Sequence, residues 1–148
     1  MLTRLNYAKA NPAALKAMMA LENAVTAGLI EKPLAELVRM RVSQLNGCAF
    51  CMDMHSHDMI SAGETPRRIF VLSGWRDSPA FSERERAALA WAEALTTLSA
   101  HHPDDATYAG LDPHFSDAEK VDLTLLIVAI NGWNRFGVGF RMVHPLRH

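Results

Sequence analysis

Helix start and stop signals recur at short intervals along this chain of 148 residues, and no segment shows the apolar–polar alternation of a half-buried strand. Asn11-Pro12 is typical of a helix start and Gly28 of a helix end. Pro33 opens a second apolar-periodic segment that Asn46-Gly47 ends. These signals predict an all-α fold, a single-domain helical bundle. Further helices are expected over about 48–63, 66–74 and 117–136. Another should begin at the capping box formed by Ser82 and Glu85. The segment 101–115 is expected to be a loop with room for one helical turn.

The last predicted helix, 117–136, begins at a second capping box, formed by Ser116 and Glu119. Its segment 121–130 is rich in β-branched residues, but its length and its capping box favour a buried helix over a strand. A helix that is apolar nearly all round needs cover on every side. A homo-oligomer would supply that cover more easily than a monomer of this size.

The overall composition predicts one domain over residues 1–148 and excludes several classes of partner. Charged residues make up 21% of the chain and the net charge is −1, with no basic run longer than Arg67-Arg68, so no nucleic acid partner is expected. The N-terminal residues lack the apolar stretch of a signal peptide, and the longest apolar run is too short to span a membrane. We therefore expect a cytoplasmic protein, in which thiols are kept reduced and a C-x-x-C pair points to redox or metal chemistry.

The only two cysteines of the chain, Cys48 and Cys51, form this C-x-x-C pair, and His55 follows one helical turn later. At the start of a helix, the first-turn amides favour the thiolate form of a cysteine. Residues three apart share a helix face, so the two sulfurs could close a disulfide. His55 lies on the same face, where an imidazole can accept a thiol proton.

A carboxylate that orients His55 would complete the arrangement of an activated nucleophile. If the helices fold back on each other about Gly47, position 36 falls opposite position 58, within about one turn of His55. Glu36 is then placed to orient the imidazole, and Asp58 is the rival for the same role.

The cysteine pair has other interpretations. The thiols could be small buried hydrophobic groups without chemistry. They could also bind zinc together with His55 and either Glu36 or His57, although structural zinc sites normally draw their ligands from two separate knuckles. The spacing with His55 favours redox chemistry over both.

The spacing of Glu36, Cys48, Cys51 and His55, E-x11-C-x-x-C-x3-H, resembles the signature of the alkylhydroperoxidase D family. That family belongs to the all-helical carboxymuconolactone decarboxylase-like superfamily. The segment 131–135, Asn-Gly-Trp-Asn-Arg, also resembles the peroxidase-related branch. The resemblance extends from about residue 34 to residue 145. Decarboxylation is disfavoured, because the true decarboxylases of the superfamily lack the cysteine pair.

This resemblance implies an antioxidant, thiol-dependent peroxidase that needs no bound cofactor. Cys51 would attack the hydroperoxide and Cys48 would resolve the product to a disulfide, while His55 and Glu36 relay protons. The implied partners are a small-molecule hydroperoxide, an external thiol or dithiol reductant, and further copies of the chain in a trimer or trimer-based assembly. Phe50 departs from the best-known pattern, which has a histidine between the cysteines. The alternative is therefore a thiol-based sensor or binding module without efficient turnover.

Overall fold

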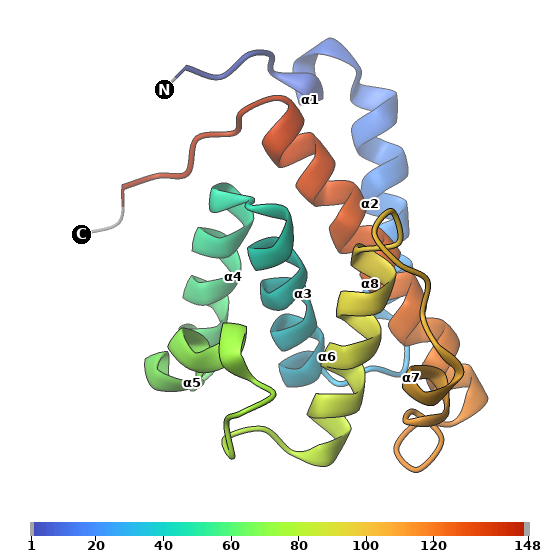
Figure 1. Cartoon of the computed structure of the whole chain (residues 1–148). Helices are drawn as coiled ribbons and strands as arrows, with labels where there is room; N and C mark the ends of the chain where they lie inside the picture. Colours follow the sequence, from blue (N-terminus) through green and yellow to red (C-terminus); the bar gives the residue numbers. More distant parts are fainter. Residues whose placement is uncertain (1, 147–148) are drawn as a thin grey trace.

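A left-handed turn at Gly47 sets the geometry of the whole molecule, because it reverses the chain between the helices that carry Glu36 and His55. Gly47 has φ +66°, a backbone conformation that costs glycine little and other residues more. Its N–H donates to carbonyl groups in the last turn of the preceding helix. The two helices therefore run antiparallel and pack side by side (Figure 1).

The computed structural model describes residues 2–146, and Met1, Arg147 and His148 lie outside the described residues. Between residues 2 and 146 the chain forms helices and no strand, as the all-α prediction requires. The elements are α1 (Tyr7–Ala10), α2 (Pro12–Thr26), α3 (Lys32–Asn46), α4 (Ala49–Ser61), α5 (Pro66–Val71), a 3-10 turn (Leu72–Gly74), α6 (Glu83–Thr96), α7 (Asp105–Ala109) and α8 (Asp117–Gly139).

The predicted caps account for most of the helix boundaries. The Asn11 side chain accepts a hydrogen bond from the Ala14 N–H at the start of α2. Both predicted capping boxes form: Ser82 opens α6 and Ser116 opens α8, each with the glutamate three residues later. Each such cap satisfies helix-end amides that would otherwise lack partners, an effect of about 1 kcal/mol.

The structure differs from the prediction at several helix ends and in one additional helix. The helix expected from Cys48 begins at Ala49, with Cys48 as its N-cap residue. The last helix continues three residues further than expected, to Gly139. The short helix α1 was not predicted, because its four residues offer too little periodicity; Asn6 caps it by accepting from the Lys9 N–H.

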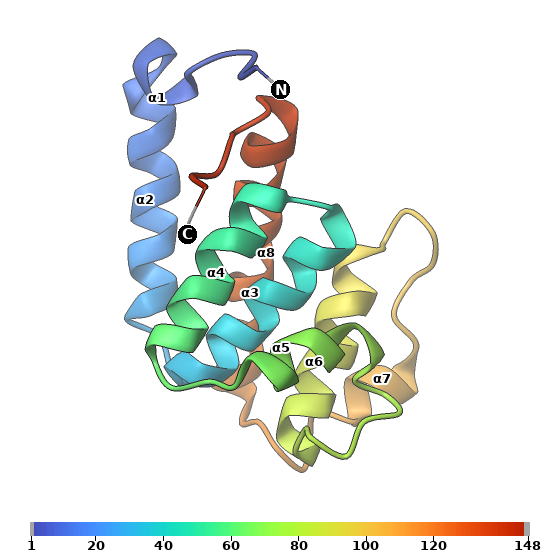
Figure 2. The same ribbon diagram turned by 90° about the vertical axis from the view of Figure 1, so that its left-hand side faces the viewer.

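Helix α3 lies at the centre of the bundle and packs against α4, α6 and α8 (Figure 1). Its residues 34–40 are all buried, including Glu36 and Arg39. Helix α2 packs along α8 and stands apart from α4, as Figure 2 shows. A cavity lies between α2 and the α3–α4 pair, lined by side chains of α2, α3, α4 and α8.

Helix α8 is only partly covered by the chain itself. Its core-facing side is buried through Leu123, Leu126 and Ile130, and each such side chain contributes about 1.5–3 kcal/mol to folding. On its outer side, however, Val121 and Val128 are 68% and 53% exposed. The expectation that this helix is covered all round is therefore not met within one chain.

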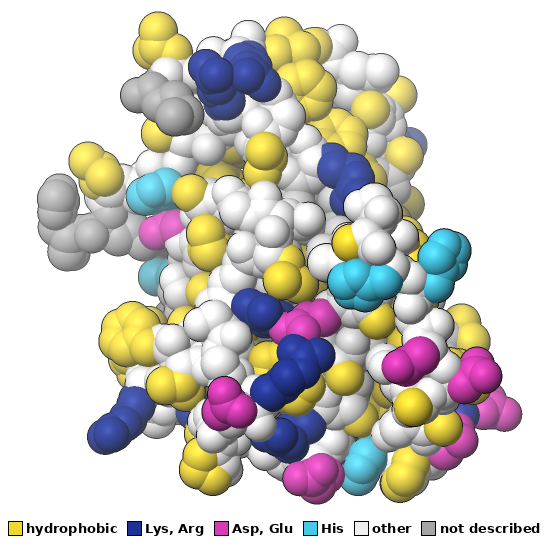
Figure 3. Space-filling view, viewed as in Figure 1, with side chains coloured by type: hydrophobic (Ala, Val, Ile, Leu, Met, Phe, Trp, Pro, Cys, Tyr) yellow, Lys and Arg dark blue, Asp and Glu magenta, His cyan; other side chains and the backbone are white. Residues whose placement is uncertain are grey.

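The viewed surface carries basic and acidic side chains interspersed with hydrophobic ones (Figure 3). Several arginines are paired with glutamates, for example Arg68 with Glu85 and Arg41 with Glu93. None of the helices between residues 2 and 146 is both long and apolar enough to cross a membrane.

Candidate active site

The two cysteines lie where α4 begins, and they form a disulfide in the structure. Both are buried, with exposures of 1% for Cys48 and 4% for Cys51. As the N-cap residue, Cys48 accepts a hydrogen bond at its Sγ from the Cys51 N–H, at 3.4 Å. The sulfurs thus sit at the positive end of the α4 dipole, an environment that stabilises a thiolate when the pair is reduced.

The two sulfurs have different surroundings. Cys51 lines the cavity between α2 and the α3–α4 pair. Cys48 does not line the cavity, and its sulfur lies closer to Gly137 of α8 than the sulfur of Cys51 does. A small molecule that enters the cavity therefore meets Cys51 first.

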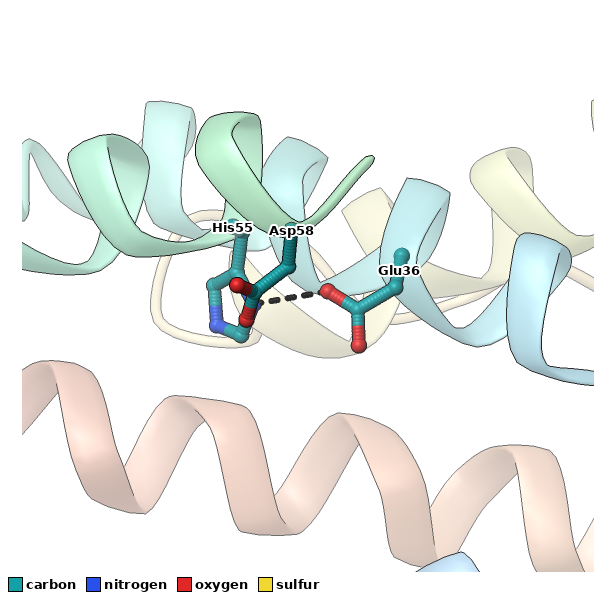
Figure 4. Close-up of side chains that lie close together, drawn as sticks. All are labelled: Glu36, His55 and Asp58. Atoms are coloured by element: carbon teal, nitrogen blue, oxygen red, sulfur yellow. Dashed lines mark hydrogen bonds and ion pairs between the residues drawn. The ribbon is translucent and has the colours of Figure 1, made fainter. Parts of the chain in front are cut away.

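His55 and Glu36 are brought together across the α3–α4 pair. Nδ1 of His55 lies 2.9 Å from Oε2 of Glu36, and both side chains are buried. Figure 4 shows Glu36 reaching from α3 toward the His55 ring on α4, with the other ring nitrogen directed away from Glu36. The fold-back about Gly47 thus produces the contact that the sequence predicted.

The Glu36 carboxylate stays ionised although it is buried. Burial by itself raises the pKa of this carboxyl, but the hydrogen bond from His55 and the charge and hydrogen bond of Arg39 outweigh burial, so that the pKa lies below its usual value. An ionised carboxylate can only accept hydrogen bonds. Nδ1 of His55 must therefore carry a proton and donate it to Glu36.

This leaves Nε2 as the nitrogen of His55 that is free to act. Nε2 is buried and has no hydrogen-bond partner among the described residues. In a neutral imidazole whose Nδ1 is protonated, Nε2 carries the lone pair. Such a nitrogen can take a proton from a neighbouring thiol.

Asp58 lies nearby but is not the partner of His55. The ligand atoms of Glu36, His55 and Asp58 all lie within 4.8 Å of one another, and Figure 4 shows Asp58 beside the ring. Asp58 Oδ1 lies 3.3 Å from Nδ1 of His57 instead, and both of those side chains are half-exposed. Of the two rival carboxylates, Glu36 makes the buried hydrogen bond.

The donor set is poorly suited to a metal ion. One oxygen of Glu36 is bonded to His55 and the other accepts from Arg39 Nη1 at 2.8 Å, so a metal would compete with a buried cation for this carboxylate. The cysteine sulfurs are joined to each other and offer no thiolate ligands in this form. Of the other candidate ligands, His57 lies at the half-exposed surface of α4.

The cavity has a volume of about 640 Å³, within the usual range for small-molecule sites. Its wall is mostly apolar and includes Leu15, Met19, Ile30, Met54, Ile130 and Trp133. Phe50, which stands where the best-known pattern has a histidine, is part of this wall. The substitution therefore replaces a polar group with apolar surface beside Cys51.

Sequence reasoning did not identify Arg39, Glu22 or Gly137 as parts of the site. Arg39 lies one turn after Glu36 on α3, and this i, i+3 spacing of opposite charges was a usable signal. The roles of Glu22 and Gly137 depend on how α2 and α8 dock, which no local pattern encodes.

The fold and the site together define an all-helical protein of the alkylhydroperoxidase D type, with a C-x-x-C disulfide at its cavity. The chain belongs to the carboxymuconolactone decarboxylase family, whose model matches residues 12–94. It is 38% identical to the uncharacterized protein YdfG of Bacillus subtilis (strain 168) over 135 residues, which cover 91% of this chain and 92% of YdfG.

Two solved structures extend the comparison. A protein of unknown function from Agrobacterium tumefaciens, suggested to be the antioxidant defence protein AhpD, is 46% identical with a TM-score of 0.96, over 99% of this chain and all of that one. An uncharacterized peroxidase-related protein from Silicibacter sp. TM1040 is 26% identical with a TM-score of 0.78, over 90% of this chain and 71% of the other. The predicted family and fold are thereby confirmed.

Proposed function

We propose that this protein is a thiol-dependent peroxidase that reduces organic hydroperoxides with its two cysteines. The observation that carries the proposal is the placement of Cys51 in the wall of the cavity, with Cys48 bonded to it. His55, held by Glu36, lines the same cavity one helical turn further along α4. The similarity to proteins described as AhpD-like or peroxidase-related supports it.

In the reduced protein, Nε2 of His55 takes the proton of the Cys51 thiol, and the thiolate attacks the hydroperoxide. A sulfur–oxygen bond forms and the oxygen–oxygen bond breaks. The alkoxide that leaves takes the proton back from His55 and departs as an alcohol. Cys51 becomes a sulfenic acid, which is two electrons more oxidised than the thiol.

Cys48 then resolves this intermediate. Its thiolate attacks the Cys51 sulfur, the disulfide forms, and the oxygen leaves as water with the proton from the Cys48 thiol and the proton of the sulfenic acid. An external thiol or dithiol returns two electrons by thiol–disulfide exchange. Since Cys51 lines the cavity, the reductant can reach its sulfur by the same route as the peroxide.

The cavity favours a bulky apolar substrate. A volume of about 640 Å³ with mostly apolar walls provides binding energy for an alkyl or aryl group and little for hydrogen peroxide. We therefore expect a higher kcat/KM for cumene hydroperoxide than for hydrogen peroxide.

Turnover with a dithiol reductant tests the proposal. Cys51→Ser and Cys48→Ser should each abolish turnover, and one equivalent of peroxide should leave a sulfenic acid on Cys51 in the Cys48→Ser protein. Full activity in the protein that lacks both thiols would contradict the proposal. Disulfide formation without turnover with any dithiol would instead support the sensor alternative.

A further inference from the structure

A continuous chain of buried and partly buried contacts runs from α8 to His55 through three other side chains. Trp133 Nε1 donates to Glu22 Oε2 at 3.0 Å, and the other Glu22 oxygen accepts from Arg39 Nη2 at 2.6 Å. Arg39 Nη1 donates to Glu36 at 2.8 Å, and Glu36 holds His55 at 2.9 Å. The chain connects α8, α2, α3 and α4, and all five residues line the cavity.

We propose that Arg39, held in place by Glu22, is a positioning residue that determines which ring nitrogen of His55 carries the proton. The inference rests on the proposed function, but what it states is the protonation of the His55 ring, which can be measured without any peroxide. Arg39 and Glu22 act through Glu36 and need not touch the substrate.

The reason is that a carboxyl group only accepts hydrogen bonds when ionised but can also donate one when protonated. Paired with Arg39, Glu36 is ionised and can only accept, so Nδ1 of His55 is the donor and Nε2 is the base. Removing the guanidinium takes away one of the groups that oppose burial and so shifts Glu36 toward the protonated carboxyl. That form can donate to Nδ1. His55 would then carry its proton on Nε2, where it could no longer accept one from Cys51.

Arg39 also fixes the orientation of Glu36. Its guanidinium is a rigid fork that binds two carboxylates at once, one from α2 and one from its own helix. Arg39 itself is 8% exposed, so its geometry is set by these two partners rather than by water. Of the other charged side chains in the cavity wall, Lys32 lies on α3 and Asp58 on α4, and neither takes part in this chain of contacts.

The simpler interpretation is that the ion pair of Arg39 and Glu22 only fastens α2 to the bundle. Val25 is the single buried residue of α2, so this helix needs other attachments. The same helix α3 offers a matched control for that role. Arg41 pairs with Glu93 at 2.7 Å, with side-chain exposures of 12% and 14%, and neither residue lines the cavity.

The experiment compares Arg39→Met with Arg41→Met in the reduced protein. The imidazole ¹⁵N chemical shifts, assigned with a His55→Gln variant, report which ring nitrogen of His55 is protonated. The rate of alkylation of Cys51 by iodoacetamide at pH 7, measured in a Cys48→Ser background, reports thiol activation. The melting temperature reports the structural contribution of each ion pair.

We expect Arg39→Met to lose the Nδ1-protonated form of His55 and to slow alkylation about 10-fold or more, up to the 10²–10⁴-fold that a positioned base contributes in full. Arg41→Met should lower the melting temperature without changing either readout, and Arg39→Lys should restore part of both. Glu22→Gln, which is close to isosteric, should show a smaller loss of the same kind and serves if Arg39→Met does not fold.

Unchanged His55 shifts and alkylation rates in both Arg39→Met and Glu22→Gln would overturn the inference. The proposed function fails separately: if the wild-type protein does not reduce hydroperoxides but Arg39→Met still alters the His55 tautomer, the positioning role holds and the peroxidase proposal does not.

Discussion

Gly137 of α8 faces the sulfur of Cys48 so closely that a β-carbon at residue 137 would lie 2.6 Å from that sulfur and 3.3 Å from the sulfur of Cys51. Real β-carbons essentially never come within 3.0 Å of such a neighbouring atom, so the 2.6 Å contact could not form without a shift of the structure. Helix α8 can therefore pass behind the cysteine pair only because residue 137 has no side chain. The close contact explains why Cys48 is almost completely buried while Cys51 reaches the cavity.

Gly137→Ala should therefore destabilise the protein by about 1–3 kcal/mol, the usual cost of forcing atoms into a packed core, and should slow formation of the disulfide. Gly139→Ala is the matched control, because a β-carbon there has no neighbour within 4 Å and alanine favours a helix by about 0.5–1 kcal/mol. Chemical denaturation and thiol counting after one equivalent of peroxide measure both effects. A Gly137→Ala protein as stable and as reactive as wild type would show that α8 adjusts freely.

Glu36→Gln should lower the rate of peroxide reduction about 10²-fold or more, because the amide cannot hold His55 as a carboxylate does. His55→Ala should lower it at least as much. Asp58→Asn should change the rate less than about 2-fold, since the contact of Asp58 is with His57 at the half-exposed surface. If the Asp58 variant were the slower of the two carboxylate variants, the assignment of the relay to Glu36 would be wrong.

The stability of the fold should fall at acid pH through the cap of α8. Hydrogen bonds from the backbone and side chain of Ser116, and then one from Arg84, lower the pKa of Glu119 from 4.5 to about 2. Because the pKa of Glu119 is lower in the folded than in the unfolded protein, its ionised carboxylate stabilises the fold, and this stabilisation is fully present above pH 4.5. It is lost as the pH falls toward 2.

Denaturant unfolding between pH 2 and pH 7 checks this expectation. Glu119→Gln should flatten the pH dependence of the free energy of unfolding. Glu83→Gln is the control and should leave that pH dependence unchanged, because the Glu83 side chain is largely exposed and its ion pair to Arg86 is 3.9 Å long. Parallel curves for wild type and Glu119→Gln would contradict the role of this cap.

The exposed apolar side chains favour assembly with further copies of the chain. Val121 and Val128 lie on the outer side of α8, and Phe70 of α5 is 80% exposed. Burying such groups stabilises an interface. We expect light scattering to give a mass of three chains of 16.4 kDa, or a multiple of three, and a monomer at micromolar concentration would contradict this.

The helices could be predicted because their ends carry local signals. Asn11, Ser82 and Ser116 satisfy the first amides of their helices, and Gly47 supplies the left-handed turn. Each of these effects involves residues only a few positions apart. The position of Glu36 beside His55 also followed locally, from the reversal of two consecutive helices.

The rest of the site depends on tertiary contacts. Glu22 meets Arg39 across 17 positions and Trp133 across 111, and such pairings appear only when α2 and α8 dock. Gly137 gave no turn signal in the sequence, because its role is to permit a close approach rather than a special backbone conformation. The sequence of α8 predicted cover on every side, supplied more easily by an oligomer, but it did not show that Val121 and Val128 are the residues one chain leaves exposed.

The most direct test is the rate at which the reduced protein loses its two thiols to cumene hydroperoxide over a range of pH, followed by thiol counting and intact mass. We predict fast loss of both thiols, with the mass change of one disulfide, at pH values well below the pKa of ~8.5 of a free cysteine. Slow loss that follows the ionisation of an ordinary cysteine would mean that α4, His55 and Glu36 do not activate this pair, and would contradict the proposed function.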